Sequence, residues 1–142
     1  MLAYPAKFDK AEDGITVTFP DIPEAVTCGF SDQQAMEYAV DALESVLSLY
    51  MNQRKPIPRP GRARGKGIRL VRLPALADAK LAVYDAMLEQ NVRKAGLARR
   101  LGWQKSLVDR LLDLQHASRL DQIELALAAL GKQLAILVED AA

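Results

Sequence analysis

The sequence predicts an α+β protein in which a small sheet domain precedes an all-helical domain. Apolar side chains alternate with a period of two over the first twenty residues, as in half-buried strands. After residue 74 they recur at three- and four-residue steps, which is the period of amphipathic helices. We therefore expect two domains, residues 1–73 and 74–142.

The first part of the chain predicts a β-hairpin and then a third strand. The residues expected on one face of the hairpin are Leu2, Tyr4, Ala6 and Phe8, followed by Ile15, Val17 and Phe19. The Asp13-Gly14 pair lies in the polar turn between the two strands and is a strong hairpin signal. Residues 25–28 form the third strand, and we expect the Cys28 side chain to be buried in it.

A long amphipathic helix follows. Ser31, with Gln34 three residues later, predicts a capping-box start. An apolar stripe continues to Met51, so that side of the helix should lie along the sheet. The opposite side is polar and acidic.

Residues 52–67 read NQRKPIPRPGRARGKG and contain three prolines, three glycines and six basic residues. This composition leaves little to bury and predicts an extended, exposed basic loop. Two roles stay open for the loop: a solvated linker, or a contact with nucleic acid or an acidic partner. A fourth strand over residues 68–73 follows and ends at Pro74.

Helices account for nearly all of the remainder. One is expected from Ala75 to Gln90, and another from about Arg119 to Leu130 with Gly131 as its cap. The apolar tail at residues 133–138 predicts a short strand, most readily at a dimer contact.

Between these helices, residues 94–111 read KAGLARRLGWQKSLVDRL and have the spacing of a helix-turn-helix. Gly102 can adopt a positive φ without steric cost, so it ends one helix and turns the chain sharply. Trp103 fills the turn, and the second helix runs from Gln104 to about Asp113. In such motifs the second helix lies in the DNA major groove. The alternative is an ordinary helical hairpin with a solvated basic face.

The outward residues of the second helix are the candidate DNA contacts. They are Gln104, Lys105, Ser106, Asp109 and Arg110. Residues 93–110 carry six basic side chains and one acidic one, which suits DNA phosphate. The expected phosphate contacts are Arg93, Lys94, Arg99 and Arg100. Two such helices in a homodimer would meet half-sites roughly 34 Å apart, or a multiple of that distance.

Charge is divided unevenly along the chain. Residues 1–53 hold nine acidic and two basic side chains, whereas residues 54–72 hold eight basic and no acidic ones. An acidic segment repels nucleic acid and attracts a basic protein. The carboxylates that we single out for such a contact are Asp21, Glu24, Glu37, Asp41 and Glu44.

No catalytic or metal-binding pattern stands out. The single histidine, His116, has no second ligand at metal-binding spacing, and no nucleophile elbow, phosphate loop or zinc pattern is present. We therefore expect no enzymatic activity, no metal and no cofactor. The single cysteine excludes an internal disulfide, and the sequence shows neither a signal peptide nor an apolar run of about 20 residues. These features predict a cytoplasmic protein.

Both halves of the chain resemble the HicB antitoxins of type II toxin–antitoxin systems. FPDIPEAVTCGFS and then QAMEYAVDALESVL are similar to the N-terminal domain of that family. IRLVRLPALADAKLAVYDAM, leading into LARRLGWQKSLVDRLLDLQHASRLDQIELALAALGK, resembles the helix-turn-helix half of one branch. The chain departs from the family pattern at Glu24-Ala25, where Gly-Cys is expected, and at Cys28, where Gln is usual.

The resemblance implies a partial ribonuclease-H-like βββαβ domain that neutralises a small toxin ribonuclease (HicA-like), and a helix-turn-helix domain that represses the operon by binding operator DNA. On this interpretation the acidic segment occludes a basic toxin without any chemistry. A rival interpretation is a stand-alone helix-turn-helix transcriptional regulator whose N-terminal domain senses a ligand or partner. A third is a metal-dependent nuclease in which Asp9 or Asp21 binds Mg²⁺.

Overall fold

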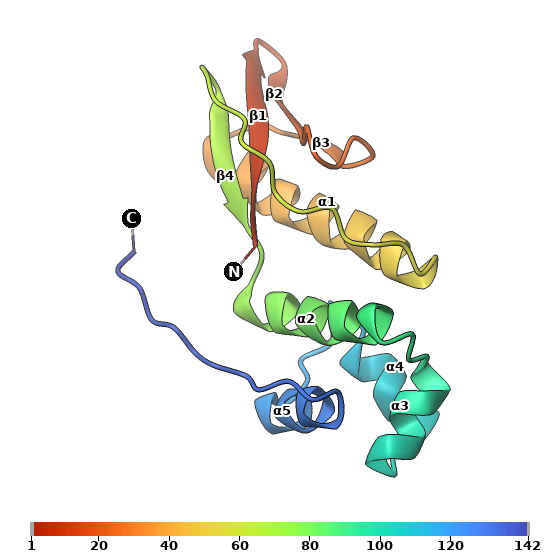
Figure 1. Cartoon of the computed structure of the whole chain (residues 1–142). Helices are drawn as coiled ribbons and strands as arrows, with labels where there is room; N and C mark the ends of the chain where they lie inside the picture. Colours follow the sequence, from red (N-terminus) through yellow and green to blue (C-terminus); the bar gives the residue numbers. More distant parts are fainter. Residues whose placement is uncertain (1, 142) are drawn as a thin grey trace. The chain divides into compact units, whose positions relative to one another are not determined.

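A computed structural model describes residues 2–141 and is α+β, as the sequence predicts (Figure 1). The chain divides into two compact units, residues 1–78 and 79–142. The division falls inside helix α2 (Ala75–Glu89). Every strand found in the described part of the chain belongs to the first unit, and the second unit is helical.

The first unit is built on a four-stranded antiparallel sheet covered on one face by a helix. In chain order its elements are β1 (Ala3–Ala11), β2 (Gly14–Thr18), β3 (Val26–Gly29), α1 (Asp32–Asn52) and β4 (Ile68–Arg72). The strand order is β3-β2-β1-β4. β1 and β2 form the predicted hairpin, with Ala11 opposite Gly14 across a tight turn. Alternate residues of both strands, among them Tyr4, Ala6 and Val17, are buried toward the core.

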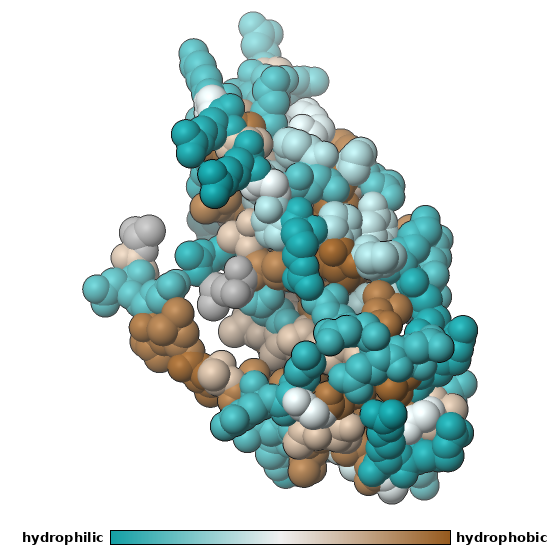
Figure 2. Space-filling view, in the orientation of Figure 1, coloured by the Kyte–Doolittle hydropathy of each residue, from teal (hydrophilic) through white to brown (hydrophobic). Residues whose placement is uncertain are grey.

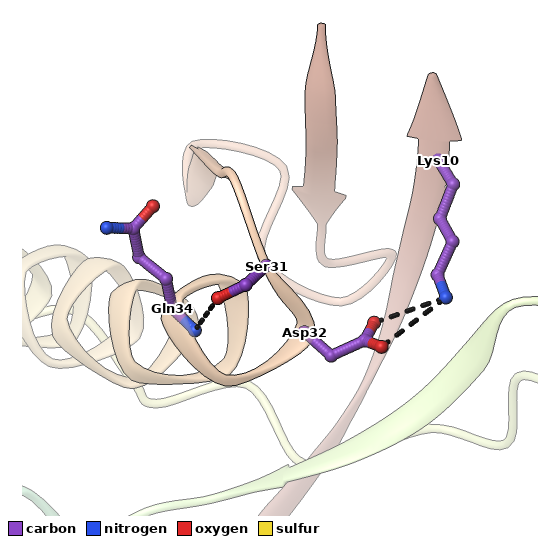
Figure 3. Close-up of polar contacts among 4 residues, drawn as sticks. All are labelled: Lys10, Ser31, Asp32 and Gln34. Carbon is purple, nitrogen blue, oxygen red and sulfur yellow. Dashed lines mark hydrogen bonds and ion pairs between the residues drawn. The ribbon is translucent and has the colours of Figure 1, made fainter. Parts of the chain in front are cut away.

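Helix α1 begins where the sequence predicts. The hydroxyl of Ser31 accepts the amide of Gln34 at 3.1 Å (Figure 3). The side chain of Gln34 accepts the amide of Phe30, one residue before the position that a strict capping box would use. Lys10 of β1 forms an exposed ion pair of 3.3 Å with Asp32 in the first helical turn (Figure 3). These contacts fix the start of α1 against the sheet.

A close approach at Gly29 sets the distance between α1 and β3. A Cβ at Gly29 would lie 2.6 Å from the amide nitrogen of Ala35, so only glycine fits there. The preceding residue, Cys28, lies opposite Thr16, and its side chain is exposed. The prediction that Cys28 is buried is therefore wrong, because the buried position of this short strand is Gly29.

The basic loop is anchored to the first unit at several points. Ile57 is buried, and the hydroxyl of Tyr4 donates to the carbonyl of Pro58 at 2.8 Å. The carboxylate of Asp21 accepts the amide of Gly61, also at 2.8 Å. The loop has no regular secondary structure, as expected, but the prediction that it is exposed throughout is wrong at Ile57.

The second unit contains α3 (Lys94–Leu101), α4 (Lys105–Leu111) and α5 (Leu120–Ala129), together with most of α2. Leu97, Val108 and Ile123 are fully buried and join α3, α4 and α5 in one core. α4 is shorter than the predicted range of 104–113, because the amide of Asp113 bonds to the carbonyl of Arg110 in a tighter turn.

The segment after α5 is irregular and apolar. Residues 133–138 form no strand, and Ile136, Leu137 and Val138 are 72–88% exposed. Figure 2 shows apolar side chains gathered near the C-terminal end of the chain. Within its described residues the second unit holds no strand for the tail to join, and the strand expected at a dimer contact stays a prediction.

No helix within residues 2–141 is both long and apolar enough to cross a membrane.

The turn at Gly102 gives a test of backbone strain with an internal control. Gly102 has φ +67° with open space around its missing Cβ, so Gly102→Ala should lower the free energy of unfolding by about 1–2 kcal/mol through backbone conformation alone. Gly96→Ala, inside α3, places its Cβ 3.5 Å from Val92 and should raise that energy by up to about 1 kcal/mol. Urea unfolding followed by Trp103 fluorescence measures both variants. Effects of the same sign would contradict this account of the turn.

Candidate nucleic-acid interface and acidic surface

Helices α3 and α4 are joined by a tight left-handed turn. Gly102 adopts φ 67° and ψ 28°, and its amide donates to the carbonyl of Arg99. The amide of Trp103 donates to the carbonyl of Ala98 at 3.0 Å, which closes a Schellman motif. Gln104 is extended, and α4 begins at the next residue.

The residues predicted to contact DNA lie on the outer side of this helix pair. Those on and just before α4 are all exposed: Gln104, Lys105, Ser106, Asp109 and Arg110. Arg93, Arg99 and Arg100 are also exposed, whereas Lys94 is half-buried. The pair therefore presents a surface in which basic side chains outnumber acidic ones.

Two contacts within the chain modify this surface. Lys94 forms an ion pair of 3.1 Å with Asp109, the only acidic residue between positions 93 and 110. Arg100 donates to the carbonyl of Ala129 at 3.3 Å. Because Lys94 and Asp109 neutralise each other, the excess positive charge of this surface comes from its arginines and Lys105.

A buried lysine behind α4 was missed by the sequence analysis. The side chain of Lys80 in α2 is fully buried, and its ammonium contacts backbone carbonyls at the C-terminal end of α4. The available signal was register, because Lys80 falls three residues after Ala77 and four before Tyr84, both of which are buried. A lysine in an apolar stripe is easily taken for an exposed neighbour of that stripe.

The five predicted acidic contacts do not form one exposed surface. Glu37 and Asp41 are exposed one turn apart on α1. Glu44, predicted to face solvent with them, is only 6% exposed, so that expectation is wrong. Glu44 lies three residues before Leu47 and seven before Met51, and the buried stripe of α1 is wide enough there to include all three.

Asp21 and Glu24 are held by contacts within the first unit. Asp21 binds the amide of Gly61 in the basic loop, and both carboxylate oxygens of Glu24 accept the hydroxyl of Tyr50, at 2.8 and 2.7 Å. The two carboxylates therefore fasten the connection between β2 and β3 to the basic loop and to α1.

The Tyr50–Glu24 hydrogen bond shifts both pKa values. Donation from the Tyr50 hydroxyl is the main cause that lowers the pKa of Glu24, and the same bond raises the pKa of Tyr50. Lys55 adds a smaller electrostatic lowering of the Glu24 pKa, and its ammonium lies 5.9 Å from the centre of the Tyr50 ring.

The fold also cancels the charge asymmetry of the sequence. The acidic segment 1–53 and the basic segment 54–72 belong to the same compact unit. Residues 1–78 contain ten acidic and ten basic side chains. Any attraction of this unit for a basic partner must therefore come from local clusters of charge rather than from its net charge.

No metal-binding donor set is present in the described part of the chain. Among residues 2–141, no group of three or more His, Cys, Asp and Glu side chains is arranged to hold a metal ion. His116 is exposed, with Nδ1 3.0 Å from the hydroxyl of Ser118. Nothing in this region favours the interpretation as a Mg²⁺-dependent nuclease.

Comparisons with known proteins show which chains this one is similar to. A family model described as "HicB_like antitoxin of bacterial toxin-antitoxin system" matches residues 3–82. "Antitoxin HicB" of Pseudomonas fluorescens is 36% identical over 141 residues, which cover 99% of this chain and 97% of the relative. "Antitoxin HicB 2" of Photorhabdus laumondii is 40% identical over 133 residues, or 94% of each chain. "Antitoxin HicB" of Escherichia coli K12 is 35% identical over 138 residues, covering 96% of this chain and 99% of the relative.

We expect Tyr50→Phe to raise the pKa of Glu24 toward its ordinary value of 4.5. A carboxylate whose pKa is lowered by folding stabilises the fold above its unfolded pKa, and this contribution is lost as pH falls through the folded pKa. The variant should therefore lose less stability than the wild type on acidification below about pH 4.5. Carbon NMR titration of the Glu24 carboxyl, together with urea unfolding at about pH 6 and about pH 3, tests both points.

Tyr38→Phe is the matched control, because Tyr38 lies on the same helix and is 41% exposed. An unchanged Glu24 titration in Tyr50→Phe would show that the hydroxyl is not the cause of the shift.

Proposed function

The chain belongs to the HicB-like antitoxin family, and from this premise we propose that it occludes a small, basic, HicA-like toxin ribonuclease and represses its own operon by binding operator DNA as a homodimer. Membership of this family implies a toxin partner and a regulatory rather than an enzymatic role. The observation that carries the proposal is that the chain exposes one basic surface, on α3 and α4, and one acidic surface, on α1. The basic surface suits DNA, and the acidic surface suits a basic toxin.

The DNA part rests on the α3–α4 pair, which we propose is a helix-turn-helix. Its exposed polar side chains are of types that read bases in the major groove: Gln104, Lys105, Ser106 and Arg110. Arg93, Arg99 and Arg100 are the proposed phosphate contacts, and Lys94 joins them when it leaves Asp109. On this proposal, the second of the two predicted domains, residues 74–142, is the DNA-binding domain.

The toxin part rests on the exposed acidic side of α1. A ribonuclease that binds RNA needs a basic face, and clustered acidic side chains on an inhibitor accelerate association with such a face. Of the five carboxylates predicted for this role, Glu37 and Asp41 face solvent on one rigid helix. We assign them the direct contact, with Asp21 and Glu24 shaping the neighbouring loop through Gly61 and Tyr50. Glu44 is buried, so we leave it out of the contact.

The homodimer is supported by the apolar tail. Ile136, Leu137 and Val138 are strongly exposed in the single chain, and burial against the same segment of a second copy would remove them from water. A dimer would also supply two copies of α4 for two DNA half-sites.

Removing two candidate base contacts tests the DNA part. We expect Lys105→Ala/Arg110→Ala to lower affinity for the promoter fragment by about 100-fold or more, because each lost base contact is worth roughly 1–3 kcal/mol. The measurement is a fluorescence-anisotropy titration with operator and scrambled duplexes. Arg119→Ala/Lys132→Ala removes the same charge outside the α3–α4 surface and is the control. Equal losses of operator affinity in the two variants would mean that α4 contributes only nonspecific electrostatic attraction.

Reversing charge on α1 tests the toxin part. We expect Glu37→Lys/Asp41→Lys to slow association with the toxin by about 10-fold at low salt, with a smaller difference at high salt because exposed charges are screened. Stopped-flow or surface-plasmon-resonance kinetics measure this rate. Operator affinity should stay unchanged.

Asp9→Lys/Glu12→Lys is the control. It makes the same change of charge at two exposed residues near the β1–β2 turn and should slow association less. An equal effect of both variants would mean that α1 is not the contact. Operator binding without toxin binding at any salt concentration would favour the stand-alone transcriptional regulator.

A further inference from the structure

The fully buried ammonium of Lys80 occupies a site made of three uncharged acceptors. It donates to the carbonyl of Arg110 at 3.0 Å, to the carbonyl of Asp113 at 2.8 Å and to the hydroxyl of Ser118 at 2.8 Å. An ammonium has three donors, so these contacts use all of them.

The site uses a property of lysine that an apolar side chain of similar size lacks, which is hydrogen-bond donation. Burying a cation is costly unless hydrogen bonds replace its hydration, and an apolar side chain of similar size often stabilises a core as well or better. Burial lowers the pKa of Lys80, while the nearby carboxylate of Asp113 acts in the opposite direction. What the ammonium supplies, and an apolar side chain cannot, is a fixed position for the groups that it binds.

Those groups belong to the end of α4 and to the connection that follows it. Arg110 lies in the last turn of α4, where carbonyls carry partial negative charge. Its carbonyl also accepts the amide of Asp113 at 3.2 Å, and the carbonyl of Asp113 accepts the amide of His116 at 3.1 Å, so the ammonium is an additional donor to both carbonyls. Asp113 lies just beyond the helix. Ser118 precedes α5, and its hydroxyl also lies 3.3 Å from the carbonyl of Arg110 and 3.0 Å from His116. Lys80 thus connects α2, the end of α4 and the approach to α5.

We propose that Lys80 is a positioning residue for DNA recognition, which fixes the end of α4 through the carbonyls of Arg110 and Asp113 and thereby holds α4 at the angle needed to read bases. The inference rests on the proposed function for its DNA part. The link is direct at Arg110, because the residue whose carbonyl Lys80 binds also carries a candidate base-reading side chain. A tilt of α4 would misplace that guanidinium while leaving the phosphate-binding arginines on α3 in place.

The test compares Lys80→Met with Lys132→Met in the full-length chain. Methionine keeps the unbranched apolar stem of lysine but ends one atom earlier and cannot donate, and Lys132 is an exposed lysine of the same unit. We expect Lys80→Met to lower the ratio of operator affinity to scrambled-duplex affinity by about 10-fold, the worth of one misplaced base contact. The slope of affinity against salt should be unchanged, since it counts phosphate contacts. Lys132→Met should match the wild type in both.

This ratio separates positioning from a merely structural role. A variant that only unfolds more of the protein loses operator and scrambled affinity by the same factor, so its ratio stays constant. A constant ratio in Lys80→Met, with the wild type preferring operator, would overturn the inference and leave the proposed function standing. A wild type without any preference for operator would overturn the proposed function and, with it, the DNA role of Lys80.

Two further measurements serve if Lys80→Met fails to fold. Ser118→Ala keeps the ammonium and both carbonyls but removes one acceptor, and it should lower the same ratio by about fivefold. In the wild type, NMR should show slowly exchanging Nζ protons on Lys80 that couple to the carbonyl carbons of Arg110 and Asp113. An unchanged ratio in Ser118→Ala, or Nζ exchange as fast as that of Lys132, would overturn the inference.

Discussion

The seven residues of α4 are too few to hold a helix by their own hydrogen bonds, and every property proposed for the DNA surface depends on how the rest of the second unit supports them. Support comes from both ends and from one side. Gly102 fixes the entry through a left-handed backbone, and Val108 is fully buried against the core. Lys80 binds the carbonyls where α4 ends. The direction of this short helix is therefore imposed by tertiary contacts, which is what a surface that reads base edges requires.

In the first unit, not every charged side chain is available to a partner. The acidic and basic segments of the sequence fold into one unit, and some of their charges hold that unit together. Asp21 binds a backbone amide of the basic loop, and Glu24 binds Tyr50. The exposed carboxylates that we assign to a partner are Glu37 and Asp41 on the solvent side of α1. Counting the acidic residues of segment 1–53 therefore overstates the negative electrostatic field that an approaching protein would meet.

Sequence reasoning succeeded where a few neighbouring residues determine the structure. The hydroxyl of Ser31 caps α1, and Gly102 turns the chain, because both effects act within one helical turn. It failed where burial depends on distant segments. Cys28 and Glu44 were misplaced because their environment is decided by which face of β3 and how much of α1 the rest of the unit covers. Lys80 was missed because its acceptors lie about 30 residues or more away in the chain and cannot be recognised from local period.

A chain that serves two charged partners does not need large opposite net charges. At physiological salt an exposed charge acts over about 8 Å, so a partner responds to the side chains within reach rather than to a total. What matters is that the charges in each surface stand on rigid backbone. On the acidic side that rigidity comes from α1, which lies directly on β3 because Gly29 has no side chain to keep Ala35 away. On the basic side it comes from a buried ammonium that adds hydrogen bonds to the carbonyls at the end of a short helix. Both are contacts of the backbone, and they fix where the charged side chains stand without contributing any charge to the surface itself.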